Sequence, residues 1–157
     1  MSNENKVMVI LNVHENGVWK DGVDKLQKGI VSAYHAHSDS SAKLRFVWFQ
    51  IPPGQGWLAG APSSASTLLV PSPDDITQER REKLMGQICD DWMQVTGCSV
   101  DEIIVNAISQ SEGKRYLDVS QTRFDPKRAK RMKLKMLLSL FTNKIRKGYM
   151  TTSVNNV

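Results

Sequence analysis

His35 is the residue whose type best suits acid–base chemistry, because an imidazole titrates near neutral pH and can take or give a proton. His37 follows two positions later. Side chains two residues apart diverge on a helix, and no third ligand stands nearby, so we expect no metal and no cofactor. Both histidines also suit the negatively polarised C-terminal end of a helix. We therefore take His35 as the candidate catalytic residue, weighed against that purely structural role.

Two further side chains could contact a small molecule. Trp57 stands in the glycine-rich stretch Gly54–Gly60, where a large aromatic group either walls a pocket or contacts a neighbouring subunit. Arg115 follows the last apolar run of the first 120 residues and could bind an anion, or be a solvated charge in a turn. The two cysteines lack the spacing of a redox or metal motif, so we expect reduced thiols.

These residues must be positioned by a chain in which strands and helices alternate. Asp21 and Ser72 are expected helix caps. Apolar runs and helical periodicity predict strands at 7–13, 44–51, 67–70 and 103–108, and helices at about 21–34 and 77–96. The result is an α/β (α+β) fold: two consecutive βαβ units form one four-stranded sheet with both helices on one face. The opposite face then needs cover, which an oligomer would supply.

The charge of the chain is divided unevenly along its length. Residues 1–120 carry 11 Lys and Arg against 15 Asp and Glu, whereas residues 121–157 carry 10 against one. We therefore divide the 157 residues into a double βαβ domain, 1–120, and a basic C-terminal helical extension, 121–157. The longest apolar run, Val7–Leu11, is too short to cross a membrane. The polar start resembles neither a signal nor a transit peptide, so a cytoplasmic location is expected.

The sequence of the extension predicts a helix that begins at Asp125 and Pro126. Lysines and arginines gather in the first half of this helix, and an apolar stripe runs along its second half. Three interpretations stay open. The helix can dock on its own oligomer, with its basic half against the acidic body. It can bind nucleic acid through its charge, or it can lie on a membrane surface.

Four stretches in this order and spacing resemble the tautomerase superfamily, above all its longer fused members such as cis-3-chloroacrylic acid dehalogenase and malonate semialdehyde decarboxylase. The stretches are 29–35, 56–60, 82–92 and 100–105. The resemblance covers roughly residues 7–116. It implies a homotrimer, a small oxo-acid or carbonyl ligand, an N-terminal proline as base and an arginine clamp at the start of the second helix.

The sequence departs from this family where the family does its chemistry. Counting along the resemblance places Val7 at the position of the proline, but six residues precede Val7, so its nitrogen is an amide without basicity. Asp74 and Asp75 stand where the clamp is expected, although Arg80 and Arg81, a turn further on, could reach in. The resemblance implies that Tyr34, beside His35, and Asn106 line the pocket.

Two hypotheses about function follow, and whether the chain is an enzyme stays open. In the first, a tautomerase-like protein binds a small carbonyl or carboxylate compound in a pocket lined by Val7, Tyr34, Asn106, Trp57 and Arg115, with the proline-based chemistry altered or lost. In the second, a non-catalytic oligomer uses its basic tail to recruit an anionic partner, either nucleic acid or a membrane surface.

Overall fold

The computed structural model describes residues 5–121 and 125–156. The first βαβ unit consists of β1 (Lys6–His14), α1 (Val23–His37) and β2 (Lys43–Ile51), and β1 and β2 are parallel. The second consists of β5 (Ser66–Leu69), α2 (Gln78–Thr96) and β6 (Ile103–Asn106), also with parallel strands. Both units predicted from the sequence are therefore confirmed.

The two units join edge to edge through an antiparallel pairing of β1 with β5. Within the described residues the main sheet has five strands in the order β6-β5-β1-β2-β7. The fifth strand, β7 (Thr151–Ser153), pairs in parallel with β2. A separate small hairpin of β3 (Trp57–Leu58) and β4 (Ala61–Pro62) lies in the connection between the units. The predicted four-stranded sheet thus gains one edge strand from the C-terminal extension.

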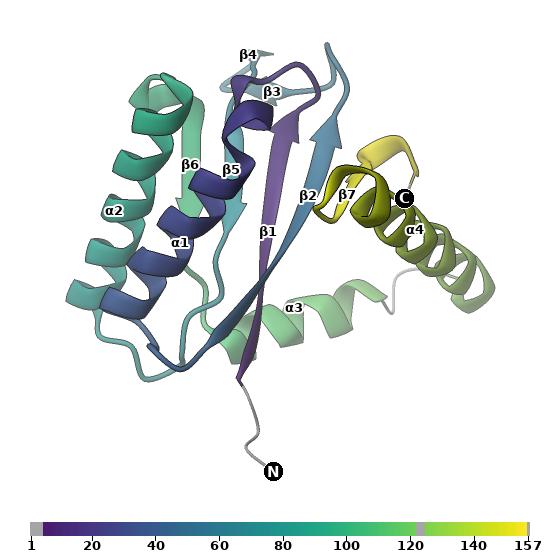
Figure 1. The fold of residues 1–157 in the computed structure, drawn as a ribbon. Helices are drawn as coiled ribbons and strands as arrows, with labels where there is room; N and C mark the ends of the chain where they lie inside the picture. Colours follow the sequence, from purple (N-terminus) through teal and green to yellow (C-terminus); the bar gives the residue numbers. More distant parts are fainter. Residues whose placement is uncertain (1–4, 122–124, 157) are drawn as a thin grey trace.

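The core lies between one face of the sheet and helices α1 and α2, which run side by side over it (Figure 1). Because side chains alternate along a strand, every second residue of β1 points at the helices. Val9, Leu11 and Val13 are completely buried there. Helices α1 and α2 meet them with apolar stripes whose buried members include Ile30 and Ile88. Burial of this continuous layer is what holds the two units together.

Among the described residues, 3-10 turns precede α1 at Val18–Gly22, precede β6 at Val100–Glu102 and follow β7 at Val154–Asn156. The first of these turns includes Asp21, so the expected cap of α1 lies ahead of the helix, whose N-cap is Gly22. Helix α2 begins as expected, but its cap is Thr77, whose hydroxyl accepts a hydrogen bond from the backbone N–H of Arg80. Ser72, the expected cap, is buried and donates to the carbonyl of Ile108.

The C-terminal third contains two helices, α3 (Gln110–Gln121) and α4 (Pro126–Lys147). Helix α3 replaces the turn that the sequence suggested around Arg115. Helix α4 starts as predicted, with Asp125 accepting a hydrogen bond from the N–H of Arg128 and Pro126 in the first turn. Figure 1 shows both helices away from the α1–α2 layer, with α4 against β7 at one edge of the sheet. No helix in the described ranges is long and apolar enough to span a membrane.

Candidate functional site

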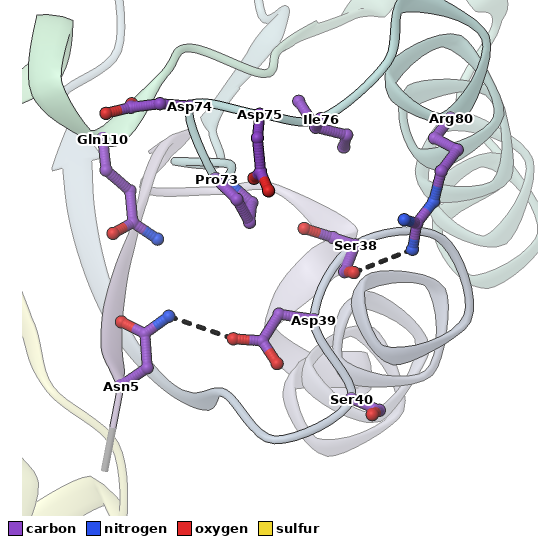
Figure 2. Close-up of a pocket in the computed structure, with 10 residues that line it drawn as sticks. All are labelled: Asn5, Ser38, Asp39, Ser40, Pro73, Asp74, Asp75, Ile76, Arg80 and Gln110. Carbon is purple, nitrogen blue, oxygen red and sulfur yellow. Dashed lines mark hydrogen bonds between the residues drawn. The ribbon is translucent and has the colours of Figure 1, made fainter. Parts of the chain in front are cut away.

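A cavity of about 490 Å³ opens at the end of the sheet where β1 begins. It is lined by Asn5, by residues 38–40 after α1, by residues 73–76 before α2, by Arg80 and by Gln110 at the start of α3 (Figure 2). This is the end of the sheet at which the resemblance places the pocket, because Val7 stands two residues after Asn5. Four chain segments that are distant in sequence therefore supply the walls.

The charge of the cavity is mainly negative. Asp39, Asp74 and Asp75 contribute carboxylates, and Arg80 contributes a guanidinium. The Nη2 atom of Arg80 donates to the carbonyl oxygen of Ser38 at 2.9 Å, so the guanidinium lies across the end of α1 (Figure 2). A carbonyl neutralises no charge, which leaves the guanidinium able to bind a further acceptor.

Asp39 is tied to both sides of the cavity. Its Oδ2 atom accepts from Nδ2 of Asn5 at 3.0 Å, and its Oδ1 atom accepts from the N–H of Ser41 at 2.9 Å and from the Ser41 hydroxyl at 2.7 Å. These hydrogen bonds to Ser41 and Asn5 hold the pKa of Asp39 below its usual value. Asp74 likewise accepts from the N–H of Ser111 at 3.0 Å. Both carboxylates therefore hold loops in place by hydrogen bonds and also give the cavity negative charge.

Two polar groups at the cavity wall have unused hydrogen-bonding capacity. The Oγ atom of Ser38 and the Nε2 atom of Gln110 are buried beside the Tyr34 hydroxyl, and neither makes a hydrogen bond of good geometry with a described residue. Buried polar groups are normally hydrogen-bonded, so such a pair indicates a place where a water or a ligand bonds. The buried hydroxyl of Tyr34 lies behind them and donates to the carbonyl of Pro71 at 2.9 Å. Burial raises the pKa of Tyr34, and its neighbours Ser38 and Gln110 offset part of that rise.

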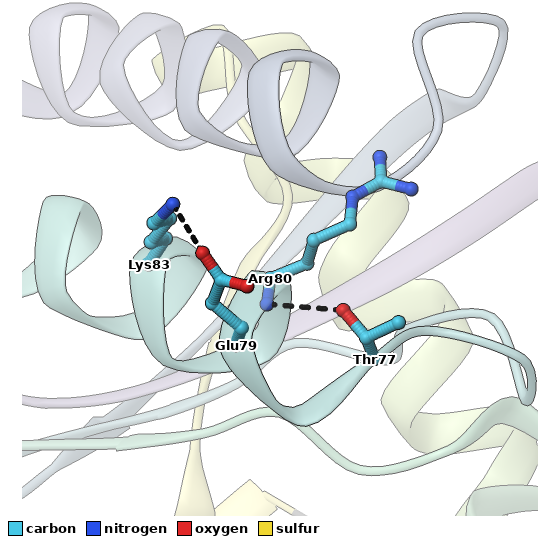
Figure 3. Close-up of polar contacts among 4 residues, drawn as sticks. All are labelled: Thr77, Glu79, Arg80 and Lys83. Carbon is cyan, nitrogen blue, oxygen red and sulfur yellow. Dashed lines mark hydrogen bonds and ion pairs between the residues drawn. The ribbon is translucent and has the colours of Figure 1, made fainter.

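The first turn of α2 explains why Arg80 is available. Glu79 and Lys83 form an ion pair of 2.7 Å one turn apart, on the solvent side of the helix. Figure 3 shows Arg80 extending away from that pair. Arg81 points elsewhere, and its Nη1 atom donates to the carbonyl of Ala107 at 3.3 Å. Of the two arginines considered from the sequence, Arg80 is therefore the one that lines the cavity.

The structure places the predicted site residues as follows. Tyr34 lies behind the cavity wall. His35 does not line it: the Nε2 atom of His35 is 2.9 Å from the carbonyl oxygen of Ala42. The side chain of Val7 is buried in the core, facing the helices. Since a carbonyl only accepts, Nε2 of His35 is the donor in this hydrogen bond.

The other three predicted contacts are dispersed. Asn106 is exposed at the end of β6, where its backbone carbonyl accepts from the N–H of Val70. Arg115 is exposed on α3. Trp57, 65% exposed, lies on the β3–β4 hairpin at the opposite end of β1 from the cavity (Figure 1). None of the three is among the residues that line the cavity.

Sequence reasoning missed Asp39 and Gln110. Asp39 stands two residues before Ser41, and an aspartate whose carboxylate accepts from the N–H two positions on is a common turn device that could have indicated an ordered loop. Gln110 was missed because α3 was not expected. The signal for that helix was the Ser109–Glu112 spacing typical of a helix start, and the Ser109 hydroxyl does donate to Glu112 at 2.7 Å.

The described residues contain no group of three or more His, Cys, Asp or Glu side chains placed to hold a metal ion. The cavity therefore offers one guanidinium, three carboxylates, and free hydrogen-bonding capacity on one hydroxyl and one amide. This set can bind a polar molecule by hydrogen bonds.

Comparison with known proteins concerns the fold. No protein-family model matches this sequence, and no curated protein matches it. Solved structures of the tautomerase superfamily do match. The chain is similar to Pt0534 inactivated by 2-oxo-3-pentynoate, at 19% identity over 65% of this chain and 84% of that one, with a TM-score of 0.56.

Two further structures give the same result. A fused 4-OT wild-type symmetric trimer matches at 12% identity over 66% of this chain and 87% of that one, with a TM-score of 0.56. N1, a member of the cis-3-chloroacrylic acid dehalogenase family, matches at 11% identity over 65% and 73%, with a TM-score of 0.57. The chain therefore has the tautomerase fold that the sequence predicted, and about a third of its length lies outside each of these matches.

Proposed function

We propose that this chain binds a small, uncharged carbonyl compound in the cavity at the start of β1, without the proline-based chemistry that the tautomerase resemblance implies. The observation that carries the proposal is the pair of buried polar groups on Ser38 and Gln110, which lie beside the Tyr34 hydroxyl without a hydrogen bond of good geometry. The hydroxyl and the amide N–H can both donate, and Arg80 adds a charged donor at the same cavity. A carbonyl oxygen is an acceptor that matches these donors.

The carboxylates favour an uncharged ligand over an oxo acid. Asp39, Asp74 and Asp75 each repel a ligand carboxylate by about 1 kcal/mol at short range in water, and by more where water is excluded. Arg80 offsets one of the three charges. The same carboxylates accept hydrogen bonds, so hydroxyl groups next to the carbonyl would be bound rather than rejected.

Two observations favour binding without catalysis. The nitrogen of Val7 is an amide in the interior of β1, which begins at Lys6. His35, the proposed base for any proton transfer in this chain, does not line the cavity. Pt0534 is inactivated by 2-oxo-3-pentynoate, which is both a carbonyl compound and a carboxylate. That property of Pt0534 supports the carbonyl group of the proposed ligand, and the three carboxylates of this cavity are the reason why the ligand is proposed to be uncharged.

We test the proposal by nuclear magnetic resonance titration of the full chain with two probes, dihydroxyacetone and pyruvate. Dihydroxyacetone is expected to shift the Gln110 side-chain amide and the Ser38 backbone signal, with pyruvate binding more weakly at low salt. Binding of pyruvate at this cavity, with no response to dihydroxyacetone, would overturn the proposal.

Substitutions test separately the hydrogen-bond donors of the cavity and the repulsion by its carboxylates. Gln110→Ala should weaken dihydroxyacetone binding by about tenfold, which corresponds to one lost hydrogen bond. Gln94→Ala, which alters an exposed glutamine near the C-terminal end of α2, is the matched control and should leave binding unchanged. Asp74→Asn combined with Asp75→Asn should strengthen pyruvate binding, by about fivefold for each charge removed.

We also propose that the protein is a homotrimer whose subunits cover the sheet face opposite α1 and α2. The fused 4-OT structure with the same fold is a trimer. On this chain, strand alternation turns Met8 toward that face, and Met8 is 53% exposed although β1 is an inner strand of the sheet.

A further inference from the structure

Helix α4 carries its largest apolar side chains on the side that faces away from the protein. We call these residues the outer stripe; each is between 53% and 73% exposed. They are Leu134, Leu137, Leu138, Phe141 and Ile145. Their spacing of three and four residues places them on one side of the helix. A continuous apolar surface of this kind is uncommon on a protein that has no partner for it.

The opposite side of α4 is fixed to the sheet edge by polar contacts. The hydroxyls of Ser139 and Thr152 are 2.8 Å apart, and Nδ2 of Asn143 donates to the carbonyl of Thr151 at 2.7 Å. Leu140 is buried beside them. Rotating the helix to bury its outer stripe would break these hydrogen bonds, so the stripe faces outward because of how α4 is anchored.

The charges of α4 border the outer stripe. Residues 126–147 contain nine Lys and Arg and no Asp or Glu. At 100° per residue, Lys133 and Lys144 fall along one edge of the stripe, and Arg131 and Lys135 fall along the other. All four are exposed. Long basic side chains on both edges of an apolar stripe can reach phosphate groups while the stripe enters a less polar layer.

We propose that α4 is a membrane-contacting helix, which lies flat on an anionic lipid surface with its outer stripe in the acyl boundary and its basic edges among the headgroups. The charge selects this occupant. Two copies of α4 packed stripe to stripe would bring basic edges together, with no acidic residue on either helix. Nucleic acid would neutralise the lysines but would leave the apolar stripe in water. An anionic bilayer satisfies both features, and α4 lies on it without spanning it.

The test is co-sedimentation of the full chain with vesicles of phosphatidylcholine, with and without phosphatidylserine. The protein is expected to bind the vesicles that contain phosphatidylserine and to bind phosphatidylcholine vesicles weakly, with binding reduced by salt. No binding to the anionic vesicles at low salt would overturn the proposal.

Two variants and two matched controls test how the helix binds. Leu138→Ser combined with Phe141→Ser removes apolar surface and keeps the charge, and should weaken binding by more than about tenfold. Lys133→Gln combined with Lys135→Gln should weaken it by about fivefold per lysine. Val100→Ser, which alters an equally exposed apolar residue away from α4, and Lys25→Gln on α1 should leave binding unchanged.

Two other outcomes would assign α4 a different partner. If the lysine variant loses binding and the Leu138/Phe141 variant retains it, the contact is electrostatic and the stripe does not enter the bilayer. If the Leu138/Phe141 variant instead has a lower mass by light scattering, the stripe is an interface between copies of this chain. Either result contradicts the proposal. Circular dichroism of each variant checks that the fold is intact.

Discussion

Among single residues, Asp39 has an effect that extends beyond its own loop. Its carboxylate accepts from Ser41 on one side and from Asn5 on the other, which joins the loop after α1 to the segment that enters β1. The residue therefore positions one wall of the cavity. It also makes the stability of the protein depend on pH, because the hydrogen bonds lower the pKa of Asp39 in the folded state.

The sign of that dependence defines the first prediction. A folded-state pKa below the unfolded value stabilises the protein above the unfolded pKa, and this stabilisation is lost as the pH falls through the folded pKa. We expect Asp39→Asn to lower the free energy of unfolding at neutral pH and to make its loss below about pH 4 less steep. Urea unfolding of both proteins over a pH series measures this. An unchanged acid limb would contradict the assignment.

Val7, Asp74 and Asp75 define the second prediction, which concerns chemistry. A tautomerase of this fold would use an N-terminal secondary amine as its base, and loss of a positioned base costs roughly 10²–10⁴ in rate. We expect no appreciable ketonisation of enol pyruvates and no dehalogenation of chloroacrylates by this chain, followed by ultraviolet absorbance and halide release.

A rescue variant sharpens this prediction. Deleting residues 1–6 and placing proline at position 7 should not restore activity, because Asp74 and Asp75 would still repel the substrate carboxylate. Substantial turnover of a 2-oxo acid by the unmodified chain would contradict the prediction and would direct attention to His35 as the base.

At the level of elements, the start of α2 positions Arg80 and so deserves a direct test. Thr77→Ala removes the side chain that accepts from the N–H of Arg80. We expect a loss of about 1 kcal/mol in the free energy of unfolding, the usual cost of losing a helix cap. Gln78→Ala, one residue later and on the surface, is the control and should change stability by less than about 0.5 kcal/mol. Thermal unfolding by circular dichroism measures both, and equal effects would contradict the capping role.

How far the elements could be predicted depended on their length and periodicity. The two βαβ units have apolar runs and helical stripes that each continue over several residues, and the structure confirms them. Strand β7 has only three residues, among them Thr151 and Thr152, and forms because their hydroxyls and backbone bond to β2 and α4. No local pattern could indicate such a strand, because the strand with which it pairs, β2, is about a hundred positions away.

The candidate site was harder to predict than the fold because it is assembled from loops. Strand periodicity places Val7 in the first strand, but it says nothing about the direction of the His35 ring. That ring turns to the carbonyl oxygen of Ala42, with which its Nε2 atom is hydrogen-bonded. Gln110 enters the cavity only because α3 begins directly after Ser109. Arg80 and Arg81 could both be considered because they lie about one turn into the expected helix, but the sequence did not distinguish them. The loop position of Asp39 had no such guide.

At the scale of the whole molecule, negative and positive charges are separated along the chain. The first 120 residues carry a net charge of −4 and the remainder +9. An anionic surface would repel the acidic part and attract α4, so the charge separation would orient the protein with the edge of the sheet near β7 toward that surface. The open face of the sheet, opposite α1 and α2, is a different surface from α4.

We expect other subunits of a trimer to cover the open face of the sheet. Met8 projects from an inner strand yet stays half-exposed, and a sheet face with such side chains is stabilised by burial against other subunits. We expect light scattering to give a mass about three times 17.7 kDa. Met8→Glu should shift the mass toward the monomer, since a charge would then have to be buried at the contact. Val18→Glu, at another exposed apolar residue, in the turn before α1, should leave the mass unchanged. A monomer at micromolar concentration, or equal effects of the two variants, would contradict the trimer.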